Sequence, residues 1–329
     1  MWAPVRWVTK FSGMLKGRAL LVVAMVSAAS FQGAAQAEAA GGEDRIRVNL
    51  FDSAMLSDQE YVVVGDRGEI FLSSDGGNSW KRAVSGTPNI LFSVSFPDEK
   101  IGWTCGQLGT VLHSADGGKT WSVQRSGTEK HLFSISFANS RHGCAAGDWG
   151  ILLYTEDGGE TWQDFSLAED IVLYGVVLMN ADTAILVGES GRIYKTEDGC
   201  RSWQRKPSPA LESLFAVCLN GERVYAAGLG GVVVYSEDLG ETWQRAVTPV
   251  EKALYSVSVA GDEGFAVGDE GTILRTTDSG RTWQAVDVPI QARLFWLGSV
   301  SLRNHSAPVG FGAGAHGFLF RIQQGNLFW

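Results

Sequence analysis

The chain has 329 residues, 45% of them apolar, and its mean hydropathy is zero, as is typical of a globular protein. It carries 27 basic and 36 acidic residues, a net charge of −9, and this balance disfavours nucleic-acid binding, which needs a basic face. Its 41 glycines indicate a fold that is dense in turns.

Residues 1–37 have the pattern of a secretory signal peptide. Four basic residues and no acid occur there, residues 19–29 are apolar, and Ala35-Gln36-Ala37 fits a cleavage site before Glu38. The apolar stretch is well short of the roughly 20 residues that span a bilayer, so cleavage is favoured over a membrane anchor. We therefore expect an exported, periplasmic protein at 38–329, with no membrane-spanning segment once the chain is cut near Ala37.

A stretch that begins with G-x-x-G and ends in tryptophan recurs six times after this segment. In its second copy, from Gly106 to Trp121, it reads G-Q-L-G-T-V-L-H-S-A-D-G-G-K-T-W. The closing tryptophans stand at 80, 121, 162, 203, 243 and 283, which is a period of 41 and then 40 residues. A period of about 40–45 residues is typical of a propeller or a solenoid.

Each repeat contains four short strand patterns, which we call A to D. Strand A is predicted at 91–96, 132–137, 173–178, 214–219 and 254–259, and it mixes large residues with small ones. Strand B ends at the first glycine of G-x-x-G, strand C follows that turn, and strand D begins at the tryptophan. Four antiparallel strands per unit predict a propeller blade, and a closed ring of blades leaves no open end.

The turn between strands C and D reads S/T-x-D-x-G-x-S/T-W. Its aspartate can accept hydrogen bonds from downstream backbone N–H groups, and its glycine supplies the positive φ that such a turn requires. The tryptophan offers an apolar body and one N–H donor. We interpret the turn as a structural clasp, formed by the pairs Asp75 and Trp80, Asp116 and Trp121, Asp157 and Trp162, Asp198 and Trp203, Asp238 and Trp243, and Asp278 and Trp283.

This turn resembles the Asp-box, or BNR repeat, of sialidase-type propellers. The fuller pattern, carried by 91–96 with 106–121 and by 132–137 with 147–162, resembles the YCF48/HCF136-like photosystem II stability and assembly factors. That resemblance implies a non-catalytic propeller of the thylakoid lumen or periplasm that helps to assemble a membrane complex. Photosynthetic members of the family are associated with a basic patch, which this sequence does not share.

The two ends of the chain set the number of blades. Residues 294–296 begin a seventh strand A, 314–317 form a seventh G-x-x-G, and 318–322 a seventh strand C. The chain then stops where the last strand D should begin, so we expect the N-terminal segment 45–49 to supply that strand and close the ring. The prediction is an all-β, seven-bladed propeller of four-stranded antiparallel blades, with six blades as the fallback.

In such a ring the B–C turns and the D–A loops share one face. Its hypothetical binding residues are Arg67, Asp148, Trp149, Glu189, Asp269, Glu270 and His316. This acidic rim would attract a basic partner surface, with Trp149 as an anchor. The competing interpretations are solvated turn residues and a Trp149 that packs on the neighbouring blade.

An enzyme is the alternative interpretation. The sialidase resemblance would imply an arginine triad, but only Arg67, Arg293 and Arg192 lie on or near this face, and Arg45-Ile46-Arg47 lacks the expected proline. A glycosidase could use two rim carboxylates. We therefore predict a scaffold or assembly factor for a membrane or envelope protein complex, without catalytic residues, cofactor or metal. The alternative is a carbohydrate-binding propeller or a sialidase-like hydrolase.

The four cysteines, at 105, 144, 200 and 218, share no position in the repeat and show no C-x-x-C spacing. Neither a disulfide framework nor a metal site is favoured by this arrangement. We expect free thiols that act as small apolar side chains, in a monomeric protein.

Overall fold

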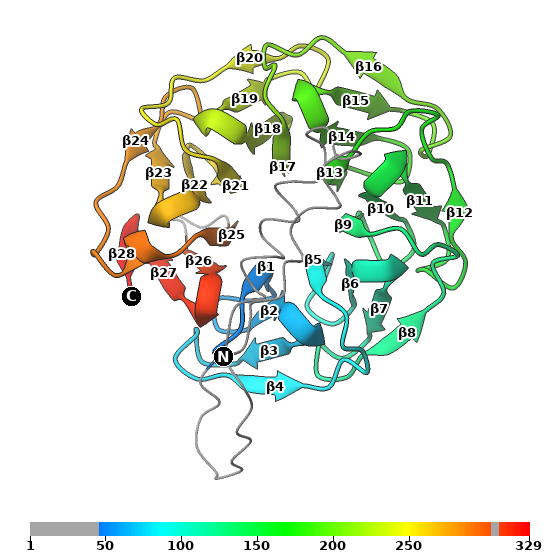
Figure 1. Cartoon of the computed structure of the whole chain (residues 1–329), viewed down its shortest axis with the longest axis horizontal. Coiled ribbons are helices and arrows are strands. Elements are labelled where there is room, and N and C mark those ends of the chain that lie inside the picture. The colour runs from blue at the N-terminus through cyan, green and yellow to red at the C-terminus, as the bar shows by residue number, and fades with distance from the viewer. Residues whose placement is uncertain (1–45, 304–308) are drawn as a thin grey trace, which may run out of the picture. The chain divides into compact units, whose positions relative to one another are not determined.

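The computed structural model describes residues 46–303 and 309–329, so the predicted signal peptide lies outside the described part. Seven four-stranded antiparallel sheets are arranged as a ring around a central axis (Figure 1). The prediction of seven blades is confirmed, and the six-bladed fallback is wrong. Within the described ranges, no helix is long and apolar enough to cross a membrane.

The strands follow the chain, blade by blade, from the axis outward. They are β1 (Leu50–Met55), β2 (Tyr61–Gly65), β3 (Ile70–Ser73), β4 (Lys81–Ala83); β5 (Leu91–Ser95), β6 (Gly102–Gly106), β7 (Val111–Ser114), β8 (Ser122–Gln124); β9 (Leu132–Phe137), β10 (Gly143–Gly147), β11 (Leu152–Thr155), β12 (Gln163–Asp164); β13 (Leu173–Leu178), β14 (Ala184–Gly188), β15 (Ile193–Thr196), β16 (Gln204–Lys206); β17 (Leu214–Asn220), β18 (Arg223–Gly228), β19 (Val233–Ser236), β20 (Gln244–Arg245); β21 (Leu254–Ala260), β22 (Glu263–Gly268), β23 (Ile273–Thr276), β24 (Gln284–Ala285); and β25 (Leu297–Arg303), β26 (Val309–Gly314), β27 (Leu319–Gln323), β28 (Asn326–Phe328).

A short 3₁₀ turn joins strands B and C in every blade. These turns are η1 (Asp66–Gly68), η2 (Gln107–Gly109), η3 (Asp148–Gly150), η4 (Glu189–Gly191), η5 (Leu229–Gly231), η6 (Asp269–Gly271) and η8 (Ala315–Gly317). One further turn, η7 (Ala292–Leu294), lies between the sixth and seventh blades. The seventh strand A therefore begins at Leu297 and not at residue 294 as the sequence predicted.

The hydrophobic core is divided among the interfaces between neighbouring blades. The buried apolar side chains of the described residues form seven clusters, and each cluster joins two adjacent blades. In the cluster of blades two and three, Trp103 is fully buried and its ring stacks on Phe137 at a centroid distance of 3.5 Å. A blade thus buries its apolar faces only when both neighbours are present.

The aspartate clasps form as predicted. In blade two, Asp116 accepts the N–H of Thr120 at 2.9 Å and its hydroxyl at 2.7 Å, while Ser114 accepts the N–H of Gly118 at 2.8 Å. The two carboxylate bonds recur in all six copies. The indole N–H of Trp121 donates to the carbonyl of Gly118 at 2.8 Å, so the turn closes on itself.

Clasp turns also touch the preceding blade. Trp103 of blade two donates its indole N–H to the carbonyl of Gly158 in the third clasp at 3.0 Å. Tyr225 of blade five likewise donates its hydroxyl to the carbonyl of Ser279 in the sixth clasp at 3.0 Å. A Cβ on Gly280 would come within 2.4 Å of the Tyr225 ring, so only glycine allows this approach. The clasps therefore hold blades together as well as closing hairpins.

Serines on the inner strands connect the blades at the axis. Their hydroxyls accept backbone N–H groups from strand A of the next blade, so that the inner edges of blades three, four and seven are paired in part. The pairs are Ser93 with Ile135, Ser95 with Phe137, Ser134 with Val176, Ser136 with Leu178, Ser256 with Val300, and Ser258 with Leu302.

The ring closes differently from our prediction. Strand D of blade seven is β28, from the C-terminal end of the chain, and not the segment 45–49. Gln324 and Gly325 both have positive φ, 51° and 73°, which makes a two-residue hairpin turn. Because this turn is shorter than an Asp-box, β28 pairs with β27 before the chain ends.

The N-terminal segment closes the ring as a loop. The side-chain oxygen of Asn49 accepts the N–H of His316 in blade seven at 3.0 Å, and its carbonyl accepts the N–H of Asp66 in blade one at 3.0 Å. Ile46 and Val48 pack against the apolar cluster between these blades. Asn49 therefore ties the first blade to the last.

All four cysteines are free, as predicted. Cys105, Cys144 and Cys200 are buried, and Cys218 is half-buried on β17. Burial and the neighbouring Cys200 thiol raise the pKa of Cys144 well above its ordinary value, which keeps this thiol protonated and unreactive.

We expect Asp116→Ala to lower the free energy of unfolding by about 1–3 kcal/mol, because the N–H and hydroxyl of Thr120 lose their acceptor. Urea unfolding of the purified variant measures this loss. Lys119→Ala, an exposed change in the same turn, is the matched control and should stay within about 0.5 kcal/mol of the parent. Equal stabilities of the two variants would show that the carboxylate does not hold the turn.

The clasps also predict how stability depends on pH. Hydrogen bonds from the hydroxyl and N–H of Ser79 lower the pKa of Asp75 to about 2, from an ordinary 3.8. A lowered folded-state pKa gives stability that is complete above the unfolded value and is lost as the pH falls through the folded one. The urea midpoint of unfolding should therefore decrease as the pH is lowered from about 4 to about 2. The Asp75→Asn variant should lose less stability over this pH range than the parent protein. The exposed change Glu160→Gln should show the same pH dependence as the parent.

Candidate functional site

The predicted rim residues lie on the B–C turns, one turn in each blade. The second residue of every turn has positive φ, from 50° to 71°, and the non-glycine examples are Arg67, Leu108, Trp149, Ser190, Glu270 and His316. These side chains are exposed. At the first position, Asp148, Glu189 and Asp269 are half-buried.

The structure does not gather the seven predicted residues into one pocket. They are distributed around the ring because each blade contributes a single turn, as Figure 1 shows. Several have partners on their own part of the rim: Lys252 pairs with Glu270, and Tyr255 donates its hydroxyl to Asp269 at 2.8 Å. Burial raises the pKa of Asp148, although His131 and Lys130 partly offset this.

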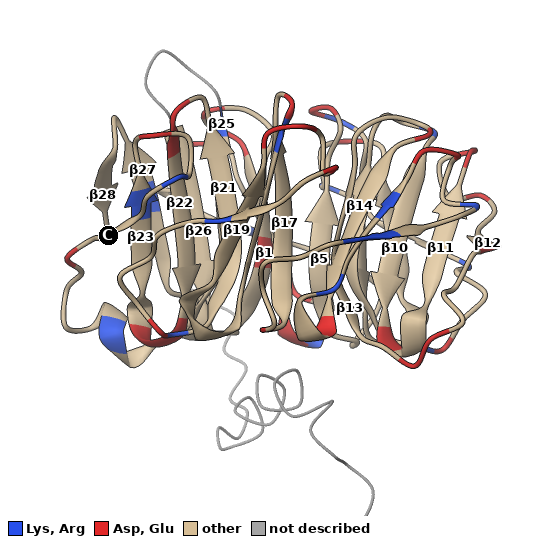
Figure 2. Ribbon diagram, turned by 90° about the horizontal axis from the view of Figure 1, so that it is seen from above, with Lys and Arg blue, Asp and Glu red and all other residues tan. Residues whose placement is uncertain are grey.

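Negative charge does not distinguish this face. Figure 2 shows Asp and Glu on the connections at both edges of the ring, with Lys and Arg among them. The opposite edge carries the clasp aspartates and the acids of the A–B loops, such as Asp98 and Glu99. The acidic rim predicted from the sequence is therefore one of two acidic edges.

Exposed apolar side chains do distinguish this face. Six of the eleven large apolar residues that are exposed in the described chain lie on its turns and loops: Leu108 (57% exposed), Trp149 (63%), Leu211 (86%), Leu229 (40%), Ile290 (76%) and Leu294 (75%). Trp149 is held outward on a residue with φ 56°, a conformation that bulky side chains rarely adopt. Its exposure contradicts the interpretation that it packs on the neighbouring blade.

Seven aromatic rings form a closed collar around the axis, which the sequence analysis missed. Six are the second residue of a strand A, and the seventh, Trp296, directly precedes β25. All lie beside the B–C face, and successive centroids lie 5.1–6.4 Å apart. The members are Phe51, Phe92, Phe133, Tyr174, Phe215, Tyr255 and Trp296. The pattern was present in the sequence as an aromatic residue after the first leucine of six strands A, but spacing alone could not show that these rings meet.

The collar surrounds a central channel of about 390 Å³. The channel wall contains the serines of the inner strands on several blades, and Gly175, Val177, Ala216 and Cys218 on blades four and five. Asp52 supplies the one carboxylate among the described residues that line it. A β-bulge in β1 at this point lets Phe51 and Asp52 both line the channel.

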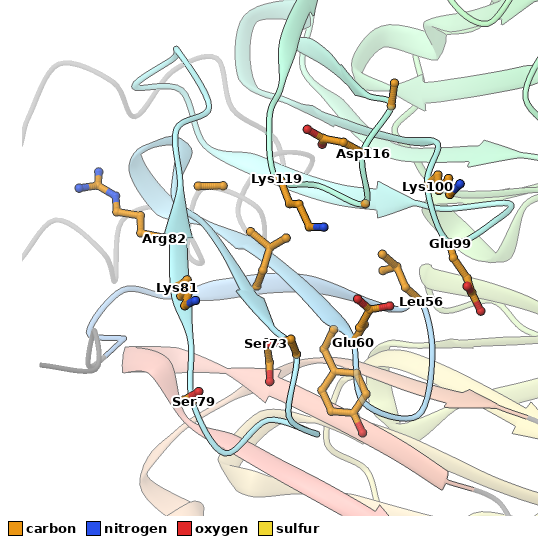
Figure 3. Close-up of a pocket in the computed structure, with 16 residues that line it drawn as sticks. Leu56, Glu60, Ser73, Ser79, Lys81, Arg82, Glu99, Lys100, Asp116 and Lys119 are labelled. Atoms are coloured by element: carbon orange, nitrogen blue, oxygen red, sulfur yellow. The ribbon is translucent and has the colours of Figure 1, made fainter.

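A second hollow of about 730 Å³ lies between blades one and two, on the side of the clasps (Figure 3). Lys81, Lys100 and Lys119 line it together with Glu60, Glu99 and Asp116. The side chain of Arg82 points away from the other labelled residues in Figure 3 and pairs with Glu69 at 2.5 Å. Opposite charges are thus balanced in this hollow, and it favours no class of ligand.

The arginines of the enzyme interpretation stand on separate blades. Arg67 lies in η1, Arg192 follows η4, and Arg293 lies in η7. Arg192 pairs with Glu169 at 3.6 Å. The ring therefore places them apart, and they do not form the triad that a sialidase uses to hold a carboxylate.

Comparison with known proteins agrees with this geometry. A sequence model described as photosynthesis system II assembly factor YCF48 matches residues 85–217 and 225–294. None of the curated proteins matches the sequence.

Solved structures show the same ring. YCF48 from Cyanidioschyzon merolae is 18% identical, with a TM-score of 0.68 over 85% of this chain and 97% of that one. A YCF48 bound to a D1 peptide is 19% identical, with a TM-score of 0.66 over 85% and 93%. An ancestral GH74 enzyme is 16% identical, with a TM-score of 0.67, and the match covers 86% of this chain and 46% of that one. At such identities these likenesses show the fold alone. The sequence model, which matches more than half of the chain, shows that the protein belongs to the family of the photosynthesis system II assembly factor YCF48.

Proposed function

We propose that this protein is an exported, non-catalytic assembly or stability factor that holds a segment of a membrane or envelope protein complex on its B–C face. Membership of the YCF48 family supports the assembly role. The YCF48 structure with a bound D1 peptide supports a peptide segment of a membrane protein as the partner. The periplasmic location rests on the signal-peptide pattern of residues 1–37.

The observation that carries the proposal is the exposed apolar set on this face, in which Trp149 is the one aromatic member. These side chains stand on turns and loops of several blades of one face, where a partner that spans those turns would bury them. Aromatic residues are also the commonest anchors of protein interfaces. Loops on a rigid scaffold are where binding residues concentrate, and each blade holds its turn in place through buried strands.

Trp149→Ala should weaken capture of the partner by about 2 kcal/mol or more, roughly a thirtyfold rise in Kd, without changing thermal stability. The partner is first identified by mass spectrometry as a membrane-complex subunit recovered from envelope extracts, and its affinity is then measured with purified proteins. Val123→Ala, a similarly exposed apolar residue on the outer strand β8, is the control and should leave Kd unchanged. A variant that binds like the parent would remove Trp149 from the docking face.

Reversing Asp269 and Glu270 to lysine should slow association with a basic partner, and the effect should be larger at low salt than at high salt. Charges on the rim act at a distance and are screened beyond about 10 Å at ordinary ionic strength. Surface plasmon resonance at two salt concentrations measures the association rate. The matched control reverses Glu99, on the opposite edge, and should have little effect. An association rate that is independent of salt, in the parent and in the double variant alike, would exclude electrostatic docking on this rim.

A further inference from the structure

The central channel contains a carboxylate without a cationic partner. Asp52 accepts the N–H groups of Ser53 at 2.8 Å and Val94 at 2.9 Å, and the hydroxyl of Ser299 at 3.2 Å. No basic side chain of the described residues pairs with it. Burial raises its pKa, against the effect of these hydrogen bonds.

Asp52 breaks the pattern of the inner strands. Its side chain bonds the N–H of Val94 in the next blade, as the serines at the equivalent positions of blades two, three and six bond theirs. A serine at this position would provide the same bond without a charge. The carboxylate is therefore not required for joining the blades, and a carboxylate in such a place is costly unless a cation meets it.

The surroundings suit a cation. Six of the seven collar rings, all but Trp296, line the channel beside Asp52. Aromatic faces attract ammonium and guanidinium groups, most strongly where water is excluded. Across the axis, the apolar wall of blades four and five offers a surface for the methylene groups of a long side chain.

We propose that the channel binds the cationic side chain of an arginine or lysine from a partner segment, with its charged head at Asp52 and its stem between the collar rings. A volume of about 390 Å³ is at the lower end of the range for ligand pockets and fits one long side chain. The collar lies beside the B–C face, so a segment docked on that face can insert this side chain into the channel through the collar. The inference rests on the proposed function, because the partner carries the cation.

The test uses two peptides and the folded protein without its signal peptide. One is a short capped glycine–alanine peptide with a single central arginine, and the other replaces that arginine with citrulline, which has nearly the same shape and no charge. Isothermal titration calorimetry measures both. We expect the arginine peptide to bind at least tenfold more tightly than the citrulline peptide.

Asp52→Ser is the decisive variant, because serine stands at this position in other blades and keeps the bond to Val94. It should lose at least tenfold in affinity for the arginine peptide and leave the citrulline peptide unchanged. Asp52→Asn serves as a second variant if the serine variant does not fold. Phe133→Leu should weaken arginine binding severalfold, whereas Phe165→Leu, an aromatic residue outside the channel, should not.

Three outcomes would overturn the inference: equal binding of the two peptides, no binding of the arginine peptide at millimolar concentration, or an unchanged affinity of Asp52→Ser. A neutral glucose oligomer that binds the channel equally well in the parent and in Asp52→Ser would replace it with a carbohydrate site. The proposed function is tested separately. Unchanged partner capture by Trp149→Ala would contradict the role of the rim, and it would leave the result of the peptide titration at Asp52 unaffected.

Discussion

Backbone N–H groups at the inner edges of blades two, three, four and seven are bonded by side chains of the preceding blade, and the ring depends on contacts between neighbouring blades. A single blade would expose that edge and two apolar faces. Hydrogen bonds between neighbouring blades also occur farther from the axis, where Trp103 and Tyr225 donate to clasp turns of the next blade. They occur at the ring closure as well, where Asn49 bonds both the first and the last blade. Stability therefore belongs to the closed ring rather than to any blade.

Because these contacts hold the blades together, the residues at certain other positions can differ from blade to blade. The second residue of each B–C turn points to solvent, so it can be Arg67, Trp149 or His316 without effect on the strands. Asp52 occupies a position where other blades carry serine and still makes the bond between blades. Asp52 thus departs from the repeat where the bond between blades does not require a charge, and Trp149 stands at a position that the repeat leaves open.

The two proposed sites would contribute differently to recognition of a partner. Exposed apolar residues on the rim can bury area against a partner, which supplies affinity. The proposed channel site would select a cationic side chain, because a neutral group would leave Asp52 without a cation. The family resemblance does not provide this second feature, since structures at 18–19% identity share the ring and leave its chemistry open.

The sequence alone determined the repeat, the four strands of each blade, the aspartate clasps and the number of blades, because these depend on local spacing and turn chemistry. It also placed the B–C turns on one face, since strand order decides that. Ring closure was predicted wrongly, because the hairpin at Gln324 and Gly325 replaces a longer clasp and shifts β28 toward β27. Only the tertiary structure decided that Trp149 is exposed, that acids line both edges, and that seven aromatic residues about 41 residues apart meet around the axis. Those facts depend on how seven blades come together, and no single repeat contains that information.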